Sequence, residues 1–137
     1  MIEVNNRTKY KVNLLLVKKV TEKFLDYHKI SNKEVSVAIV SDQEIKKLNR
    51  IYRHKDRVTD ILSFEGEGDF LGEIIIDYAQ IKKQAKEFGK KVNEELIFIL
   101  VHGLLHLIGY NDETENERLK MISLGEKFGS LKCKKEK

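Results

Sequence analysis

Two histidines one helical turn apart are the residues whose type and spacing most clearly indicate chemistry. His102 and His106 interrupt residues 96–108, which are otherwise apolar. Side chains four residues apart share one face of an α-helix, so both imidazole rings can point at one ion. Gly109 follows three residues later and can end the helix in a left-handed conformation. Asp112, three residues further on, can then reach the same ion.

The full pattern, H-x-x-x-H-x-x-G-x-x-D, predicts a divalent metal site. Its spacing is that of metzincin-type sites with aspartate in the third place. A single histidine on an apolar helix is usually a hydrogen-bonded core residue, but two buried imidazoles would each need a partner. Three protein ligands leave one position open, which is typical of catalytic zinc sites. We therefore predict that His102, His106 and Asp112 bind a catalytic metal ion.

The residue beside the first histidine separates two kinds of hydrolase. Zinc peptidases have a glutamate general base there, in the pattern H-E-x-x-H. This chain has Gly103 at that position, which makes proteolysis a minor alternative. We also expect the missing side chain to leave room beside the ion for a large substrate.

A run of basic residues precedes the histidine segment. Arg50, Arg53, Lys55 and Arg57 lie within eight residues. Arginine can bind phosphate through two hydrogen bonds and stabilise the charge of a phosphorane-like transition state. Such a run can equally be a solvated loop surface. Next to a metal site without a carboxylate base, it favours phosphodiester hydrolysis.

The apolar pattern predicts a mixed sheet surrounded by helices. Strands are expected near residues 2–4, at 34–40, and at 61–64 and 71–77, where a glycine-rich acidic link indicates an antiparallel hairpin. Helices are expected at 10–27, from a Ser41 cap, from an Asp77 cap to Gly89, from an Asn93 cap to 108, and from Thr114 to Gly129. The Ser41 helix should bury Tyr52 or Ile51. The helix ending at 108 should be central and buried. This order predicts an α+β fold, an α/β sandwich with about five helices.

Length and composition are consistent with a single domain over residues 1–137. The chain is 41% hydrophobic and 35% charged, with a net charge of +4 that favours nucleic acid as a partner only slightly. We expect residues 131–137 to be disordered. The sequence has no apolar run of the roughly 20 residues that cross a bilayer, and its one cysteine, Cys133, cannot form an internal disulfide. These features predict a cytoplasmic protein.

Two segments together resemble the YbeY family of bacterial ribosomal RNA maturation factors, described as metal-dependent single-strand endoribonucleases. The family stretch L-N-x-x-Y-R-x-K-D-x-x-T-D-x-L-S-F matches residues 48–64, and H-G-x-L-H-L-x-G-Y-D-H matches residues 102–112 except at its end. The segment LGEIII and the Gln84-Ala85 pair also fit the family.

The resemblance implies a fold with metalloprotease-like topology and zinc bound by His102 and His106. It implies that Arg53 is the catalytically important basic residue. It also implies a role in processing the 3′ end of small-subunit ribosomal RNA and in ribosome quality control. The expected partners are therefore ribosomal RNA and components of the small ribosomal subunit.

The end of the histidine motif departs from the family pattern. The family has Y-D-H where this chain has Tyr110, Asn111 and Asp112, so an aspartate replaces the third histidine. Aspartate can bind zinc, but it lowers the net charge of the site, which can weaken zinc binding or favour another divalent metal. Two alternatives stay open: a zinc metallopeptidase-like hydrolase, and a non-catalytic ribosome-assembly factor with a weak metal site.

Overall fold

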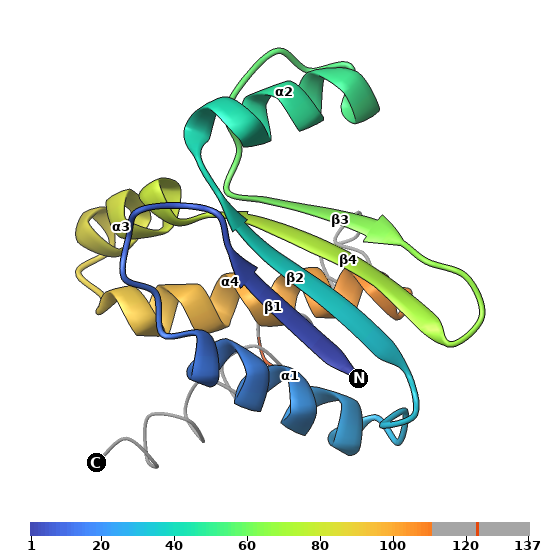
Figure 1. Ribbon diagram of the computed structural model, residues 1–137. Helices are drawn as coiled ribbons and strands as arrows, with labels where there is room; N and C mark the ends of the chain where they lie inside the picture. Colours follow the sequence, from blue (N-terminus) through green and yellow to red (C-terminus); the bar gives the residue numbers. More distant parts are fainter. Residues whose placement is uncertain (111–122, 124–137) are drawn as a thin grey trace.

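A four-stranded mixed sheet forms the centre of the molecule, in a computed structural model that describes residues 1–110 and Ser123 (Figure 1). The strands lie in the order β1-β2-β4-β3, with β1, β2 and β4 parallel and β3 antiparallel to β4. Their bounds are β1 Ile2–Asn6, β2 Glu34–Val40, β3 Ile61–Glu65 and β4 Phe70–Asp77. The predicted hairpin of β3 with β4 is therefore confirmed, and so is the predicted mixed sheet.

Helices cover both faces of this sheet (Figure 1). On one face lie α1 (Leu14–Tyr27) and α4 (Val92–Leu107), with α3 (Tyr78–Glu87) beside α4. Of the described helices, only α2 (Asp42–Arg53) lies on the other face. Alternate strand residues point to opposite faces, so Val37 and Ile39 pack in the larger core under α1 and α4, whereas Ala38 packs in the smaller core under α2. The α+β fold class is confirmed.

Side-chain caps determine where the helices begin. The side chain of Asn13 accepts a hydrogen bond from the backbone N–H of Leu16 at 3.0 Å, so α1 begins at Leu14 and not at residue 10, as the sequence had predicted. Ser41 caps α2 as predicted, accepting from Glu44 N at 3.2 Å. The predicted Asn93 cap is wrong. The N-cap of α4 is Lys91, because its backbone N–H donates to the carboxylate of Glu94 at 3.0 Å.

The end of α2 also differs from the prediction. Ile51 and Tyr52 are 48% and 58% exposed, although one of them was expected to be buried. The buried positions of α2 are Ile45 and Asn49, over the middle of the sheet. Tyr52 lies on the same side of the helix but one turn further on, where it meets the ring of Phe64 on the edge strand β3. Tyr52 therefore lies over the edge strand and stays largely exposed.

Some predictions concern residues outside the described part of the chain. These are the helix from Thr114 to Gly129, the disorder of residues 131–137, and the positions of Asp112 and Cys133. Within the described part, none of the helices has the length and apolar character needed to cross a membrane.

Candidate functional site

An open cleft of about 990 Å³ lies between α4 and the edge strand β3. It brings together side chains that are far apart in the sequence, because Arg53 at the end of α2 and the two histidines of α4 line the same space. The lining residues are Arg53, Lys55, Thr59, Ile61, Leu62, Ser63, Phe64, Glu65, His102, His106, Leu107, Gly109 and Tyr110. Two of the sequence-predicted features, the histidine pair and part of the basic run, therefore meet in one cleft.

The histidine pair consists of two partly exposed imidazoles on successive turns of α4. Their Nε2 atoms are 3.1 Å apart, and the ring planes are inclined at 77°. Two nitrogens in a tetrahedral zinc site, each about 2.0–2.1 Å from the ion, lie about 3.3 Å apart. The pair in this structure is already close to that separation and lines the cleft. These two donors fit a divalent metal ion.

The chain turns back directly after the histidine pair. Gly109 has a φ of 101°, in the region that favours glycine, as the sequence predicted. The backbone N–H of Tyr110 donates to the carbonyl of Leu105 at 3.0 Å, which closes the end of the helix. Among the residues that the structure describes, no third histidine, cysteine or carboxylate joins the pair in a metal-binding group. Asp112 lies beyond these residues, so its role as third ligand stays a prediction.

Gly103 has a different role from the one expected. It is buried, and a β-carbon there would lie 2.5 Å from Cδ1 of Ile61 and 3.1 Å from Oγ of Ser63. The missing side chain therefore does not leave space beside an ion. Instead, it lets α4 pack closely against β3, the strand on the other side of the cleft.

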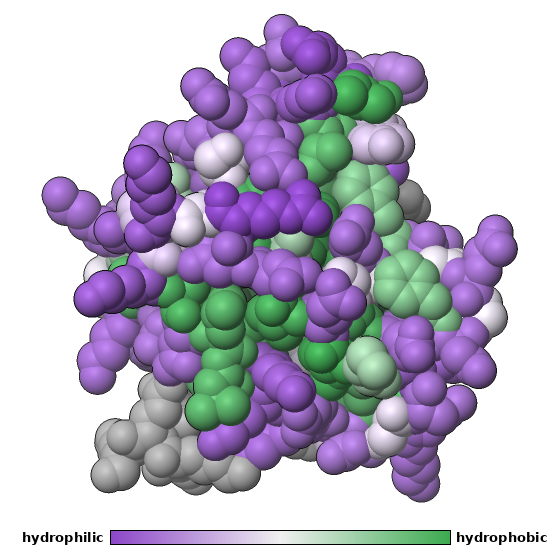
Figure 2. Space-filling view, viewed as in Figure 1, coloured by the Kyte–Doolittle hydropathy of each residue, from purple (hydrophilic) through white to green (hydrophobic). Residues whose placement is uncertain are grey.

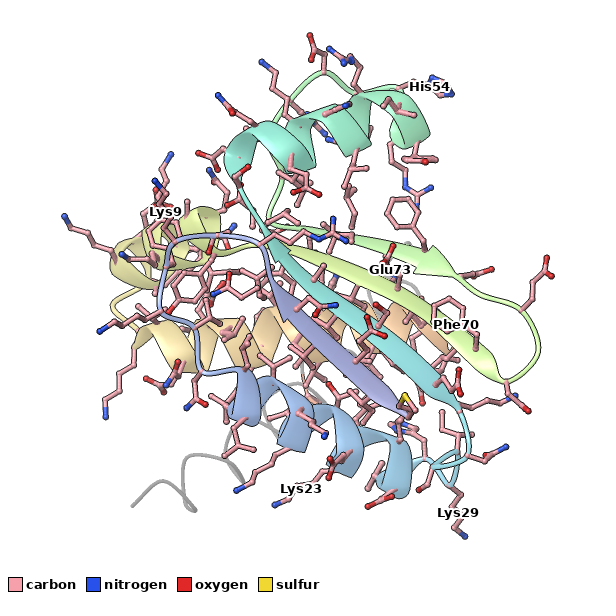
Figure 3. The ribbon with its side chains drawn as sticks, in the orientation of Figure 1. Lys9, Lys23, Lys29, His54, Phe70 and Glu73 are labelled. Carbon is pink, nitrogen blue, oxygen red and sulfur yellow. The ribbon has the colours of Figure 1, made fainter. Side chains whose placement is uncertain are left out.

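Arg53 is held at the edge of the cleft by two contacts with β3. Its Nη2 donates to the backbone carbonyl of Ser63 at 2.7 Å, and its guanidinium carbon lies 4.9 Å from the centre of the Phe64 ring. His54, which follows directly, has a φ of 58° and ends α2; Figure 3 labels it at that end of the helix. A guanidinium has five N–H donors, so the bond to Ser63 leaves Arg53 able to bind an anion.

The rest of the basic run is only partly at the cleft. Lys55 lines it, whereas Arg50 and Arg57 are exposed and do not. The side-chain amide of Asn49 donates to the backbone carbonyl of Arg57 at 3.0 Å, which fixes the return of this loop toward β3. The spacing of the four basic residues did not show which ones face β3, and only the resemblance to the family had singled out Arg53.

A second polar cluster, the carboxyl pair Asp42 and Asp77, lies at the first turns of α2 and α3, and neither residue lines the cleft. Asp77 is fully buried, and its Oδ1 accepts from the backbone N–H groups of Ala79 at 3.0 Å and Gln80 at 3.4 Å. Burial, followed by the hydrogen bond and the charge of Asp42, raises the pKa of Asp77 to about 7. The sequence predicted Asp77 as a helix cap, which is confirmed, but not its raised pKa.

The fold and the cleft define a class: a small α+β domain in which a histidine pair on α4 shares a cleft with an arginine that ends α2 and contacts the edge strand β3. The sequence model of the family "Endoribonuclease YbeY" matches residues 3–130 of the chain. This chain belongs to the Endoribonuclease YbeY family, as its motifs predicted.

Individual relatives agree with this assignment. The Endoribonuclease YbeY of Nautilia profundicola is 38% identical over 123 residues, covering 88% of this chain and 84% of the relative. That of Persephonella marina is 41% identical over 116 residues, covering 79% and 76%. The solution structure of TM1509 from Thermotoga maritima is 32% identical and superposes with a TM-score of 0.69, over 94% of this chain and 87% of that chain.

Proposed function

We propose that this protein is a metal-dependent endoribonuclease that cleaves single-stranded RNA during maturation of the 3′ end of small-subunit ribosomal RNA and in ribosome quality control. The observation that carries the proposal is the meeting of the histidine pair and Arg53 in one open cleft. The names of its relatives, Endoribonuclease YbeY, support an RNA phosphodiester as the substrate. Its partners would be ribosomal RNA and small-subunit components, in the cytoplasm.

His102 and His106 would hold the metal ion, with Asp112 as the third ligand. Zinc suits two imidazoles and a carboxylate, and another divalent ion is the alternative because a carboxylate replaces an imidazole. When bound, such an ion supplies a Lewis acid that polarises a phosphoryl oxygen and lowers the pKa of water. Because the two Nε2 atoms are already 3.1 Å apart, binding requires little rearrangement of α4.

Arg53 would bind the phosphate at which cleavage occurs. Its guanidinium is exposed to the cleft but fixed by the Ser63 carbonyl and the Phe64 ring, so it is oriented before substrate arrives. A preoriented cation stabilises the extra negative charge that develops on the phosphoryl oxygens in the transition state. Lys55, on the same wall, would attract the RNA backbone without fixing its register.

The direct test combines metal analysis with a cleavage assay. Protein purified without chelator should contain about one divalent ion per chain and cleave a single-stranded RNA, and chelator should stop cleavage. His102→Ala and His106→Ala should lose the metal and lower cleavage together by more than about 100-fold. A His28→Gln variant, altered at a histidine outside the cleft and purified identically, controls for contaminating nucleases.

The outcomes separate the alternatives. Full RNA cleavage by either alanine variant would contradict the proposal. Hydrolysis of peptides instead of RNA would favour the metallopeptidase. Weakly bound metal with no cleavage of any substrate would favour the non-catalytic assembly factor.

A further inference from the structure

An exposed aromatic side chain, Tyr52, lies next to a residue that lines the cleft. Tyr52 is 58% exposed, and its ring centre is 5.4 Å from that of Phe64 with the planes inclined at 67°. Phe64 lines the cleft, so its ring connects Tyr52 to that space. In Figure 2, hydrophobic side chains reach the surface between the end of α2 and the sheet.

Tyr52 is also placed next to the phosphate-binding arginine. The guanidinium of Arg53 lies 4.9 Å from the centre of the same Phe64 ring that Tyr52 contacts. The cation of Arg53 and the exposed ring of Tyr52 therefore both contact Phe64 on β3. In a nucleotide, the phosphate and the base are likewise a charged group and a flat ring held side by side. The guanidinium of Arg53 and the ring of Tyr52 therefore match the phosphate and the base of one nucleotide.

We propose that Tyr52, supported by Phe64, is a stacking subsite for one unpaired nucleobase, next to the phosphate that Arg53 binds. The proposal rests on the proposed function, and it adds a base-binding residue to a site otherwise made of metal ligands and cations. Every base has a π face, so the subsite tolerates any sequence. A paired base is already stacked inside a duplex, so the subsite favours single strands.

The alternative is that Tyr52 only helps to hold α2 on β3. The side chain that packs α2 onto the sheet is Ile45, which is fully buried, whereas most of the surface of Tyr52 faces solvent. Tyr27 provides a matched comparison. It is 49% exposed and makes a similar edge contact with the His28 ring at 4.9 Å, but it lies at the end of α1, outside the cleft.

The test uses the full chain with chelator, so that RNA binds without being cleaved. The probe is a short single-stranded RNA with 2-aminopurine, whose fluorescence is quenched by stacking, placed at each position in turn. We expect wild-type protein to quench one position strongly. Tyr52→Leu should lose that quenching and weaken binding by about 5- to 150-fold, since stacking contributes roughly 1–3 kcal/mol per base. Tyr52→Phe and Tyr27→Leu should behave like wild type.

An abasic RNA tests the same contact without altering the protein. Removing the base at the quenched position should weaken binding to wild type as much as Tyr52→Leu does, with no further loss when both changes are combined. Equal binding and quenching by wild type and Tyr52→Leu would overturn the stacking subsite. If those two proteins also cleave RNA equally when metal is present, the proposed function stands and only the subsite fails. If wild type neither binds nor cleaves RNA, both fail.

Discussion

The cleft and the carboxyl pair are two polar clusters among the described residues, and they use their polar groups in different ways. Asp77 is completely buried, and its carboxyl oxygen is occupied by backbone N–H groups at the start of α3. His102, His106 and Arg53 instead border an open space of about 990 Å³. The buried carboxyl of Asp77 therefore has a structural role, whereas the side chains that border the open cleft can bind a ligand.

This difference predicts which properties each cluster controls. Changes in the cleft should affect RNA cleavage and leave the free energy of unfolding almost unaltered. Changes at the carboxyl pair should do the reverse. Changes at the packing contacts beneath the cleft should affect both.

The largest effect is expected from Arg53→Ala. Loss of the oriented guanidinium should reduce RNA cleavage by roughly 100- to 1000-fold, because transition-state charge is no longer stabilised. Metal content, measured by elemental analysis, and the melting temperature should stay the same. Arg50→Ala, which removes an equally charged and exposed side chain outside the cleft, is the control. A similar loss in both variants would mean that overall charge, and not the position of Arg53, is what matters.

Gly72→Ala should lower stability and metal affinity together, unlike a change at either polar cluster. Gly72 has a φ of 154°, and a β-carbon there would lie 2.4 Å from the carbonyl oxygen of Phe64 and 2.7 Å from Cδ2 of Leu107. We expect the free energy of unfolding, measured in urea, to fall by roughly 2–4 kcal/mol. Metal affinity should also fall, because Leu107 follows His106.

Gly68→Ala is the matched control for Gly72. Its φ is 61°, but nothing lies within 4 Å of the added carbon. Only the strain of the left-handed backbone should remain, about 1–2 kcal/mol, with unaltered metal affinity. Equal losses in both variants would show that close packing at Gly72 is unimportant.

Asp77→Asn should alter how stability depends on pH. The folded-state pKa of Asp77 is about 7, above its ordinary value of 3.8, so its contribution to stability is fully present below pH 3.8 and is lost as pH rises to about 7. Asparagine keeps the helix cap but cannot ionise. Relative to wild type, the variant should gain on the order of 2 kcal/mol between pH 5 and pH 8 in urea denaturation, with unchanged cleavage at pH 7. A constant difference between the two proteins at all pH values would contradict this.

The smallest effect is expected from His54→Gly. His54 has a φ of 58°, a conformation that costs a non-glycine residue about 1 kcal/mol, so glycine should raise the melting temperature by a few degrees. Lys29→Gly is the control, since Lys29 has a φ of 59° at the end of α1, far from Arg53 in the sequence. Both variants should keep full cleavage. A loss confined to His54→Gly would show that the His54 side chain, or a stiff end of α2, helps to orient Arg53.

Local patterns predicted the features that depend on neighbouring residues. The i, i+4 spacing placed His102 and His106 on one helix face, and the turn at Gly109 followed from its position after them. The glycine-rich link predicted the β3–β4 hairpin, and Asp77 was recognised as a cap. Each of these depends on a few consecutive residues, so a single sequence contains the necessary information.

Features that depend on distant packing were not predictable in this way. Gly103 was interpreted as space beside an ion because it follows His102, a predicted ligand, but Ile61 and Ser63, about 40 residues away, occupy that space. Tyr52 or Ile51 was expected to be buried from the helical spacing, but Tyr52 lies against Phe64 of the edge strand β3 and stays 58% exposed. In both cases the prediction depended on which distant residues pack against the position. The periodicity of one segment does not identify those residues.

The helix α4 carries the histidine pair and also contributes more buried side chains than any other described helix. It follows the whole sheet in the sequence, so during synthesis the strands leave the ribosome before the helix that covers them. Until α4 docks, the apolar face formed by Val37, Ile39 and Ile74 has no cover from it. The two sides of the cleft and the main core therefore form in the same late step. A nascent chain that stops before this helix lacks the histidine pair and the largest helical contribution to the core.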